Sequence, residues 1–237
     1  MDIDLKGKHL VIAVPAYDGK VPAKWMEEFF SLSRLSISYG FTVSLSYQIH
    51  GALIANNRNI AVAEFLETTG THLLFIDADI LFSAEDIIKM MAYTDLPDET
   101  YEIIHAAYPL KSDTPQFHVE VGKELEETKY GLWRSYAAGC GFVMMKRNVL
   151  EAMCEKYTEL FYRNRFLDKT MYALFDQMIV NPREGGDPIY LGEDVSFFRR
   201  WKDMGGEMWC DPQIRLKHIG TKTYDASLKD LMNSIKE

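Results

Sequence analysis

The sequence contains few cysteines and lacks the long apolar segments of membrane proteins. Its three cysteines, Cys140, Cys154 and Cys210, are an odd number and lie far apart, with no Cys-x-x-Cys spacing. We therefore expect reduced thiols rather than a disulfide framework. No segment approaches the roughly 20 apolar residues of a transmembrane helix. The charged residues 1–8 lack the apolar core of a signal peptide. These absences predict a soluble, cytoplasmic protein.

The chain also contains fewer basic than acidic residues. It has 26 lysines and arginines against 35 aspartates and glutamates, a formal net charge of −9 and a pI near 5.2. This balance argues against a diffuse surface for nucleic acid or another polyanion, although a local basic groove is compatible with it. The 237 residues, 47% of them hydrophobic, show no internal repeat, low-complexity tract or linker. One domain with a substantial core is expected.

Strand and helix patterns alternate in the first half of the chain. Gly40 and Gly70 follow two of the helical patterns as expected helix stops. The resulting β-α-β-α-β-α-β order is typical of a doubly wound, nucleotide-binding type of α/β sheet. The predicted strands are 9–16, 41–48, 73–76 and 103–108, and the predicted helices are 22–39, 54–68 and 84–93, the last with Ser83 as its N-cap.

The second half has shorter and more varied segments. A helix is expected to open at Gly192-Glu193-Asp194, and residues 158–190, rich in aromatics, Asn, Pro and Gly, are expected to form an irregular loop region that faces substrate. Residues 112–136 would share the selection of that substrate. The other predicted elements are strands at 117–122, 131–136, 142–145, 208–210 and 214–219 and helices at 149–157 and 195–204.

Two aspartates interrupt the apolar run at the end of one predicted strand. Residues 73–76 are continuously apolar and follow Thr69 and Gly70, so this strand is expected to be buried on both faces. Asp77 and Asp79 come directly after it, and side chains spaced i, i+2 on an extended chain point the same way. We expect crowded carboxylates at the sheet edge that binds ligands, compensated by Mg²⁺ or Mn²⁺ shared with substrate phosphates. The alternative is a helix-capping aspartate beside a solvated one.

Three further features follow the two aspartates in a fixed order. They are a glycine turn at Gly139-Cys140-Gly141, Glu193-Asp194 at a predicted helix start, and a late His218. Together the four features resemble the GT-A glycosyltransferases, which carry an Asp-x-Asp motif, a glycine loop, a Glu-Asp pair and a C-terminal histidine. The resemblance spans roughly residues 9–224. The chain is also similar to small glycosyltransferases of phage and marine bacteria.

The resemblance implies a fold and a division of the chain. The fold would be GT-A, an α/β fold with a Rossmann-like, mostly parallel central sheet flanked by helices. Residues 1–237 would form one domain. Its nucleotide-binding half would be 1–111, and its acceptor and metal half would be 112–237.

The resemblance also implies a donor site around a divalent metal. Asp79 and His218 would ligate Mn²⁺ or Mg²⁺, and Asp77 would hold the nucleotide ribose or assist the metal. Lys222, four residues after His218, would meet the diphosphate. Arg58, near a helix start, could meet the nucleotide or its phosphate. Taken alone, a histidine is more often structural, and both basic residues could simply be solvated.

Other candidate residues belong to the base and acceptor sides of the site. Tyr17, in the loop after the first strand, would stack on the base. Gly139 and Gly141 suit a turn where backbone approaches a sugar closely, or a plain tight turn. Asp194, or less favourably Glu193, would be the general base that removes the proton of the acceptor hydroxyl. The alternative for Asp194 is an ordinary helix cap.

The implied function is transfer of a sugar from a nucleotide-sugar donor, with UDP favoured by its frequency in the family, to an acceptor hydroxyl. Two other functions stay open. A phosphohydrolase of the haloacid-dehalogenase type also places Asp-x-Asp after a buried strand, but Leu81 stands where threonine or valine is usual. A non-catalytic sugar or nucleotide binding module is the other, although it gives Asp194 no purpose.

The acceptor is expected to be a glycan or lipid-linked sugar, with modified phage DNA as the lesser possibility. Basic pairs could form a nucleic-acid groove beside the site, but on an acidic chain such pairs are more often solvated. The pairs are Lys146-Arg147, Arg163 with Arg165, and Arg199-Arg200. The donor sugar and the oligomeric state stay open.

Overall fold

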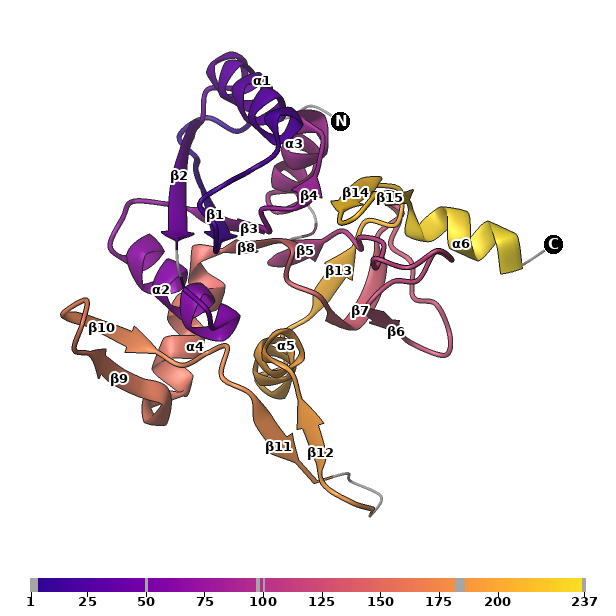
Figure 1. The fold of residues 1–237 in the computed structure, drawn as a ribbon. Coiled ribbons are helices and arrows are strands. Elements are labelled where there is room, and N and C mark those ends of the chain that lie inside the picture. The colour runs from indigo at the N-terminus through magenta and orange to yellow at the C-terminus, as the bar shows by residue number, and fades with distance from the viewer. Residues whose placement is uncertain (1–3, 50, 97–98, 100, 182–185, 236–237) are drawn as a thin grey trace.

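The computed structural model describes residues 4–49, 51–96, 99, 101–181 and 186–235. Its centre is an eight-stranded sheet with helices on both faces (Figure 1). In spatial order the strands are β2 (Thr42–Ile49), β1 (His9–Ala16), β3 (His72–Ile76), β8 (Phe142–Lys146), β5 (Ile103–His105), β13 (Met208–Cys210), β7 (Trp133–Ala138) and β6 (Val119–Val121).

The sheet is mixed but largely parallel in strand direction. The pairs β1–β2, β1–β3 and β5–β13 are parallel, whereas β8 is antiparallel to β3 and β5, and β7 is antiparallel to β13 and β6. Thus β8 and β7 run against the other strands. The predicted α/β class is confirmed, and the sheet is compatible with a Rossmann-like fold. Strand β8, from the second half of the chain, lies between β3 and β5 of the first half.

Two helical layers explain why the central strands are apolar throughout. Alternate side chains of a strand point to opposite faces, so β1 contributes Leu10 and Ile12 to one core and Val11 to the other. Trp25 from α1 (Ala23–Tyr39) belongs to the first core, which α3 (Ala84–Tyr93) also covers. Phe65 belongs to the second. The helices that cover this second core are α2 (Ile54–Leu66), α4 (Arg147–Lys156) and α5 (Glu193–Asp203).

Most predicted elements are present with small shifts of their ends. Helix α1 ends at Gly40, whose φ of 74° is the left-handed conformation that glycine adopts without strain. Ser83 does occupy the N-cap of α3, but its hydroxyl donates to Glu85, and the first helical N–H, of Ala84, donates to Glu28 of α1 at 3.2 Å. Strand β5 ends at His105 rather than at residue 108, so the following residues leave the sheet.

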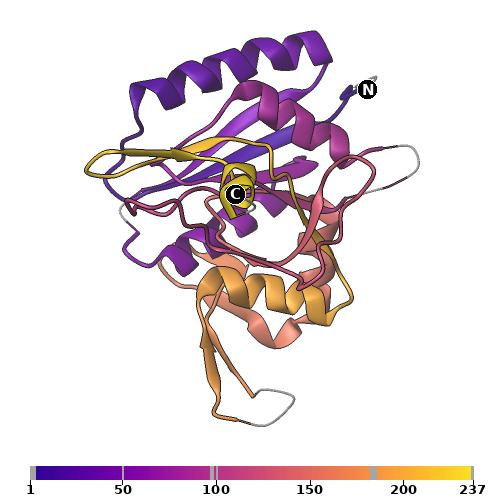
Figure 2. The same ribbon diagram turned by 90° about the vertical axis from the view of Figure 1, so that its right-hand side faces the viewer.

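The prediction of an irregular loop over residues 158–190 is wrong. A 3₁₀ turn, η1 (Thr158–Leu160), leads into a hairpin of β9 (Phe161–Asn164) and β10 (Lys169–Tyr172), and a second hairpin pairs β11 (Met178–Val180) with β12 (Ile189–Leu191). These strands are short, and the sequence pattern did not reveal them. Asp168, between β9 and β10, adopts a φ of 51°, which suits a hairpin turn. The β11–β12 hairpin extends away from the body (Figures 1 and 2).

A small second sheet joins the chain after the aspartates to the C-terminal region. It contains β15 (Thr223–Ala226), β14 (Leu216–Ile219) and β4 (Ile80–Leu81), and α6 (Leu228–Ile235) follows it. His218 in β14 pairs with Ile80 in β4, and the N–H of Ile219 donates to the carbonyl of Asp79 at 2.8 Å. This register brings His218 beside the aspartates. Among the described residues, no helix is long and apolar enough to cross a membrane.

Candidate functional site

The two aspartates after β3 turn in different directions. The N–H of Asp77 donates to the carbonyl of Gly141 at 2.9 Å, and the N–H of Ile80 donates back to the carbonyl of Asp77 at 3.0 Å. This bond closes a turn at Ala78 and Asp79, so the chain is not extended between the carboxylates. The expectation that both side chains point the same way is therefore wrong, and each carboxylate has its own cationic partner.

Asp79 lies at a cluster with His218 and Lys111. Its Oδ2 is 3.3 Å from Nε2 of His218 and 2.6 Å from Nζ of Lys111. The Nδ1–H of His218 donates to the carbonyl of Pro109 at 2.9 Å, which fixes the ring and directs Nε2 toward the carboxylate. Burial raises the pKa of Asp79, but the hydrogen bonds from His218 and Lys111 outweigh burial and lower it to about 2. Asp79 is thus ionised at neutral pH.

This cluster offers a partial set of metal ligands. A carboxylate oxygen and an imidazole nitrogen suit Mn²⁺, and Mg²⁺ commonly keeps water and substrate phosphates as its remaining ligands. Within the described ranges, no group of three or more His, Cys, Asp or Glu side chains could hold a metal. Asp79 and His218 therefore offer two ligand atoms to such an ion. Asp77 is directed elsewhere.

Asp77 is paired with a buried arginine. Arg58 of α2 is only 2% exposed, and its Nη2 lies 3.3 Å from Oδ1 of Asp77. The guanidinium also donates to the carbonyl of Cys140 at 3.3 Å and lies over the ring of Phe75. Burial raises the pKa of Asp77, and although Arg58 opposes this, the nearby charges of Asp79 and Asp194 keep it raised. Arg58 faces the core here, and its predicted contact with nucleotide stays a prediction.

The glycine turn makes room for Tyr108. A methyl group on Gly139 would overlap the Tyr108 hydroxyl, and one on Gly141 would lie 2.7 Å from Cε1 of Tyr108 and 2.9 Å from Oδ2 of Asp77. The Tyr108 ring also packs edge-on against His218, with centroids 5.3 Å apart. Tyr108 therefore contacts both His218, the partner of Asp79, and the glycine turn beside Asp77. In this structure the glycines are required by a tyrosine, and their predicted approach to a sugar stays untested.

Asp194 approaches the same turn from the start of α5. Gly192 is the N-cap of that helix, and Oδ2 of Asp194 accepts the N–H of Cys140 at 3.0 Å. Burial favours neutral Asp194, but hydrogen bonds from Glu193 and Cys140 and the charge of Arg58 lower its pKa. Burial raises the pKa of Glu193, and its hydrogen bond with Asp194 and the charge of Asp194 raise it further, to about 7. Asp194 carries the negative charge of this pair.

A pocket of about 580 Å³ lies over the aspartates. Tyr17, 66% exposed in the loop after β1, lines it together with Asp77 and Asp79. A smaller hollow of about 360 Å³ adjoins it, because Tyr17 and Ile54 line both. Tyr17 is thus within the same pocket as the two aspartates.

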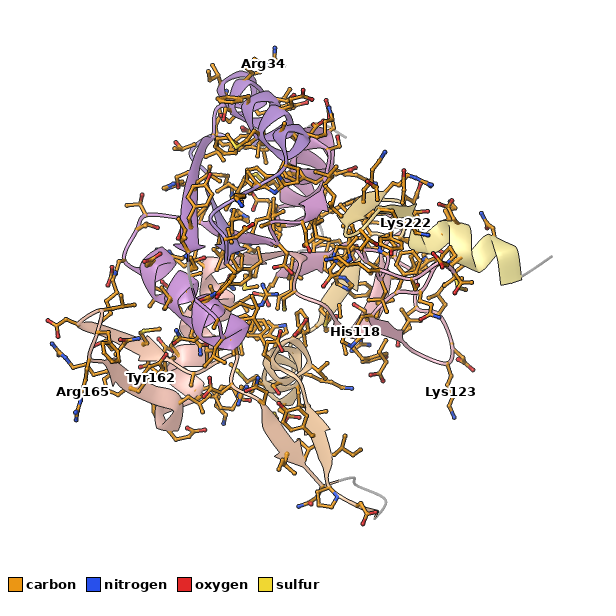
Figure 3. The ribbon with its side chains drawn as sticks, viewed as in Figure 1. Arg34, His118, Lys123, Tyr162, Arg165 and Lys222 are labelled. Carbon is orange, nitrogen blue, oxygen red and sulfur yellow. The ribbon has the colours of Figure 1, made fainter. Side chains whose placement is uncertain are left out.

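Lys222 lies at the flank of the site. Figure 3 shows it near β14 and β15. Its ammonium pairs with Asp113 and lies 5.3 Å from the ring centre of Tyr224. Lys111 is closer to the aspartates, and a methyl group on the neighbouring Gly220 would lie 3.0 Å from its Cδ.

Sequence reasoning missed Lys111 and Tyr108 as site residues. Both lie in residues 106–111, which follow β5 toward the aspartates. The available signal was position: polar side chains that follow a strand at the ligand-binding edge of a sheet.

Several members of the basic pairs have partners within the chain. Arg147 donates to backbone carbonyls, among them that of Gly70 at 2.7 Å, and Arg199 pairs with Asp203 at 2.9 Å. Arg200 is buried and donates to the carbonyl of Leu174. These side chains stabilise the chain's own loops and helices.

Comparison with known proteins adds little to this geometry. No model of a known protein family matches the chain, and no curated protein matches it. Among solved structures, the chain is similar to a glycosyltransferase involved in the glycosylation of the major capsid of PBCV-1, with 12% sequence identity and a TM-score of 0.33. The alignment covers 60% of this chain and 62% of that one, less than two thirds of its length. We therefore base the proposed function on the site geometry.

Proposed function

We propose that this protein is a metal-dependent glycosyltransferase of the GT-A type, which transfers a sugar from a nucleotide-sugar donor to an acceptor hydroxyl. One observation carries the proposal. Asp77 and Asp194, one from each acidic pair, both hydrogen-bond to the glycine turn at the edge of the sheet, and Asp77 and Asp79 line a pocket of about 580 Å³. In metal-dependent, inverting glycosyl transfer, a cation-binding carboxylate acts at the leaving diphosphate and a basic carboxylate acts at the attacking hydroxyl.

The residues would divide the work as follows. Asp79 and His218 would hold Mn²⁺ or Mg²⁺, which supplies Lewis-acid stabilisation of the charge that grows on the departing diphosphate. Asp77, held by Arg58, would contact the ribose or assist the metal site. Asp194 would take the proton from the acceptor hydroxyl, because it is the ionised member of its pair.

Two further residues would complete the donor site. Tyr17 would stack on the base from the loop after β1. Lys222, on the turn after His218, would reach toward the diphosphate. We take the nucleotide to be a uridine nucleotide.

We expect nucleotide binding to require both a divalent metal and Asp79. In a thermal-shift panel with UDP, GDP, CDP and dTDP, UDP with Mn²⁺ should raise the Tm most, and EDTA should remove the shift. Asp79→Ala should abolish this metal-dependent shift because it removes a ligand that has no replacement in the cluster. Asp203→Ala, which breaks a surface pair with Arg199, serves as the control. An unchanged UDP shift in Asp79→Ala would overturn the metal assignment, and a larger shift with GDP or dTDP would overturn the choice of base.

Lys111→Met should move two affinities in opposite directions. The Lys111 ammonium competes with a metal for Oδ2 of Asp79, so its removal should tighten Mn²⁺ binding about two- to fivefold, as expected for an exposed ion pair. UDP binding should weaken, because a cation near the diphosphate is lost. Isothermal calorimetry with Mn²⁺ alone and with UDP measures both. Lys217→Met, on β14 beside His218, removes the same charge from a pair with Asp225 and should change neither affinity. Weaker Mn²⁺ binding in Lys111→Met would contradict the competition.

The site geometry supports the two alternative functions less well. A phosphohydrolase of the haloacid-dehalogenase type would use Asp77 as its nucleophile, and in this structure Asp77 is paired with the buried Arg58. In a non-catalytic binding module, Asp194 would serve only to hold the glycine turn through the Cys140 N–H.

A further inference from the structure

A second, larger pocket is lined by none of the residues that were given a role in the proposed function. Its volume is about 730 Å³, and it lies between the start of α2, strand β9 and residues 173–177. Ile54 lines this pocket and also the one that contains Asp77 and Asp79. The two pockets therefore share Ile54 in their walls. A molecule in the larger pocket would lie next to a donor held over the aspartates.

One wall of this pocket is fixed by buried polar side chains. Asn59 of α2 is 1% exposed; its Nδ2 donates to Oδ1 of Asp176 at 3.1 Å, and its Oδ1 accepts the N–H of Phe175 at 3.0 Å. From α5, Arg200 donates to the carbonyls of Leu174 and Asp176 at 2.9 and 2.8 Å. Two helices thus hold the exposed carboxylate of Asp176 in one position at the pocket. Such preorganisation favours binding because the ordering cost is met during folding.

Aromatic side chains of β9 also line the pocket. Phe161 of β9 is 51% exposed, although its ring packs edge-on against Tyr172 with centroids 5.6 Å apart. Tyr162, labelled in Figure 3 on the same hairpin, also lines the pocket. A half-exposed phenylalanine at a pocket wall offers a flat apolar face to a ligand. The same hairpin was expected from sequence to be an irregular loop.

The charged side chains that line this pocket favour one class of acceptor over another. Glu159 and Asp176 are its charged side chains, Asn56 and Gln177 add amides, and no lysine or arginine is among its described lining residues. Carboxylates repel the phosphates of a nucleic acid, whose binding relies on lysine and arginine. They accept hydrogen bonds from hydroxyl groups, and the amides both donate and accept. Acidic and amide groups beside an aromatic face suit a polyhydroxylated ring with one apolar side.

We propose that this pocket is the acceptor site and that the acceptor is an uncharged glycan. The assignment rests on the proposed transferase function and names its second substrate class. Asp176 and Glu159 would bind hydroxyl groups of the glycan, and Phe161 would pack against a sugar face. The reacting hydroxyl would then lie past Ile54, toward Asp77 and the donor.

Saturation-transfer NMR on the whole protein tests the assignment with maltose, cellobiose and lactose, and with a 12-nucleotide oligothymidylate. At least one disaccharide should bind the wild type, and Phe161→Ala and Asp176→Asn should weaken that binding about tenfold. Asp176→Asn keeps an oxygen for Asn59, so the wall should stay folded. The matched controls lie on the β9–β10 hairpin outside the pocket: Phe166→Ala removes a fully exposed ring, and Asp168→Asn sits at a φ that asparagine tolerates.

The outcomes separate this inference from the function on which it rests. UDP binding with Mn²⁺, measured on the same samples, should be unchanged in all four variants. The assignment of the acceptor site is wrong if UDP binds but no disaccharide does, or if disaccharide binding survives both pocket substitutions. In either case the transferase proposal stands. Binding of the oligothymidylate in competition with the disaccharides would overturn the glycan assignment. Absence of binding to all four nucleotides, UDP, GDP, CDP and dTDP, by the wild type would overturn the transferase proposal and the acceptor role with it.

Discussion

Asp194→Asn is expected to lower the turnover of sugar transfer about 10²- to 10⁴-fold while the fold and the affinity for UDP stay intact. The loss follows from the chemistry of the acceptor, because a sugar hydroxyl is a very weak acid and needs a carboxylate to remove its proton as the new bond forms. Asparagine keeps an oxygen that can accept the Cys140 N–H, so the contact with the glycine turn survives. UDP release under saturating donor, with circular dichroism as the check on folding, measures the effect. An unfolded variant would instead assign Asp194 a structural role.

The pH dependence of turnover distinguishes Asp194 from its neighbour. Because the pKa of Asp194 is lowered, a base at Asp194 is already ionised in the acidic range and should give activity that does not rise near neutrality. The pKa of Glu193 is raised to about 7, so a base at Glu193 would give activity that increases as the pH passes through that value. A rise centred near pH 7 in the wild type, lost in Glu193→Gln, would transfer the role to Glu193.

The stereochemistry of the product gives a second check on the base. A carboxylate placed opposite the leaving diphosphate enforces attack from the far face, so the anomeric centre should be inverted. Product NMR reads this directly. Retention of configuration would remove Asp194 from the base role, even if sugar transfer itself were observed.

Arg58→Met should destabilise the protein by about 3–5 kcal/mol, the usual cost of breaking a buried ion pair on one side. Methionine keeps much of the length of arginine but leaves the Asp77 carboxylate without its counter-ion and the Cys140 carbonyl without a donor. Urea denaturation gives the free energy of unfolding. The control is Arg34→Met on the exposed face of α1, labelled in Figure 3, which should change stability by no more than about 0.5 kcal/mol.

A double variant shows whether the cost comes from the bare carboxylate. Asp77→Asn combined with Arg58→Met removes both charges, so it should recover part of the stability lost in Arg58→Met alone. A loss below about 1 kcal/mol in the single variant would contradict a buried pair, since surface substitutions fall in that range. Loss of UDP binding without loss of stability would instead support the predicted contact of Arg58 with the nucleotide.

The elements of the first half were predictable because their signals are local. Continuous apolar runs mark β1 and β3, and Gly40 marks the end of α1 by its own conformation. The β9–β10 hairpin was missed because its strands are only four residues each. Local patterns identify an element when it is long or fully buried, and these strands are neither.

The partners within the site were not predictable from spacing. The turn at Ala78 separates the aspartates, and only the fold shows that Asp77 meets Arg58 whereas Asp79 meets Lys111, 32 residues further on. The pairing of His218 with Asp79 depends on the register of β14 with β4. The structure brings Asp77, Asp79 and His218 together after β3, and their roles stay predictions that the experiments above test.

The position of β8 has a consequence for how the chain is made. Strands β3 and β5 are complete by His105, yet the strand between them ends only at Lys146. During synthesis, at roughly 5–20 residues per second, the emerging chain therefore carries two apolar strands with unpaired edges for several seconds. Such edges are templates for aggregation, and long-range strand pairing is slow. The nascent protein would depend on chaperones at this stage, and a fragment cut after residue 111 would keep both exposed edges permanently.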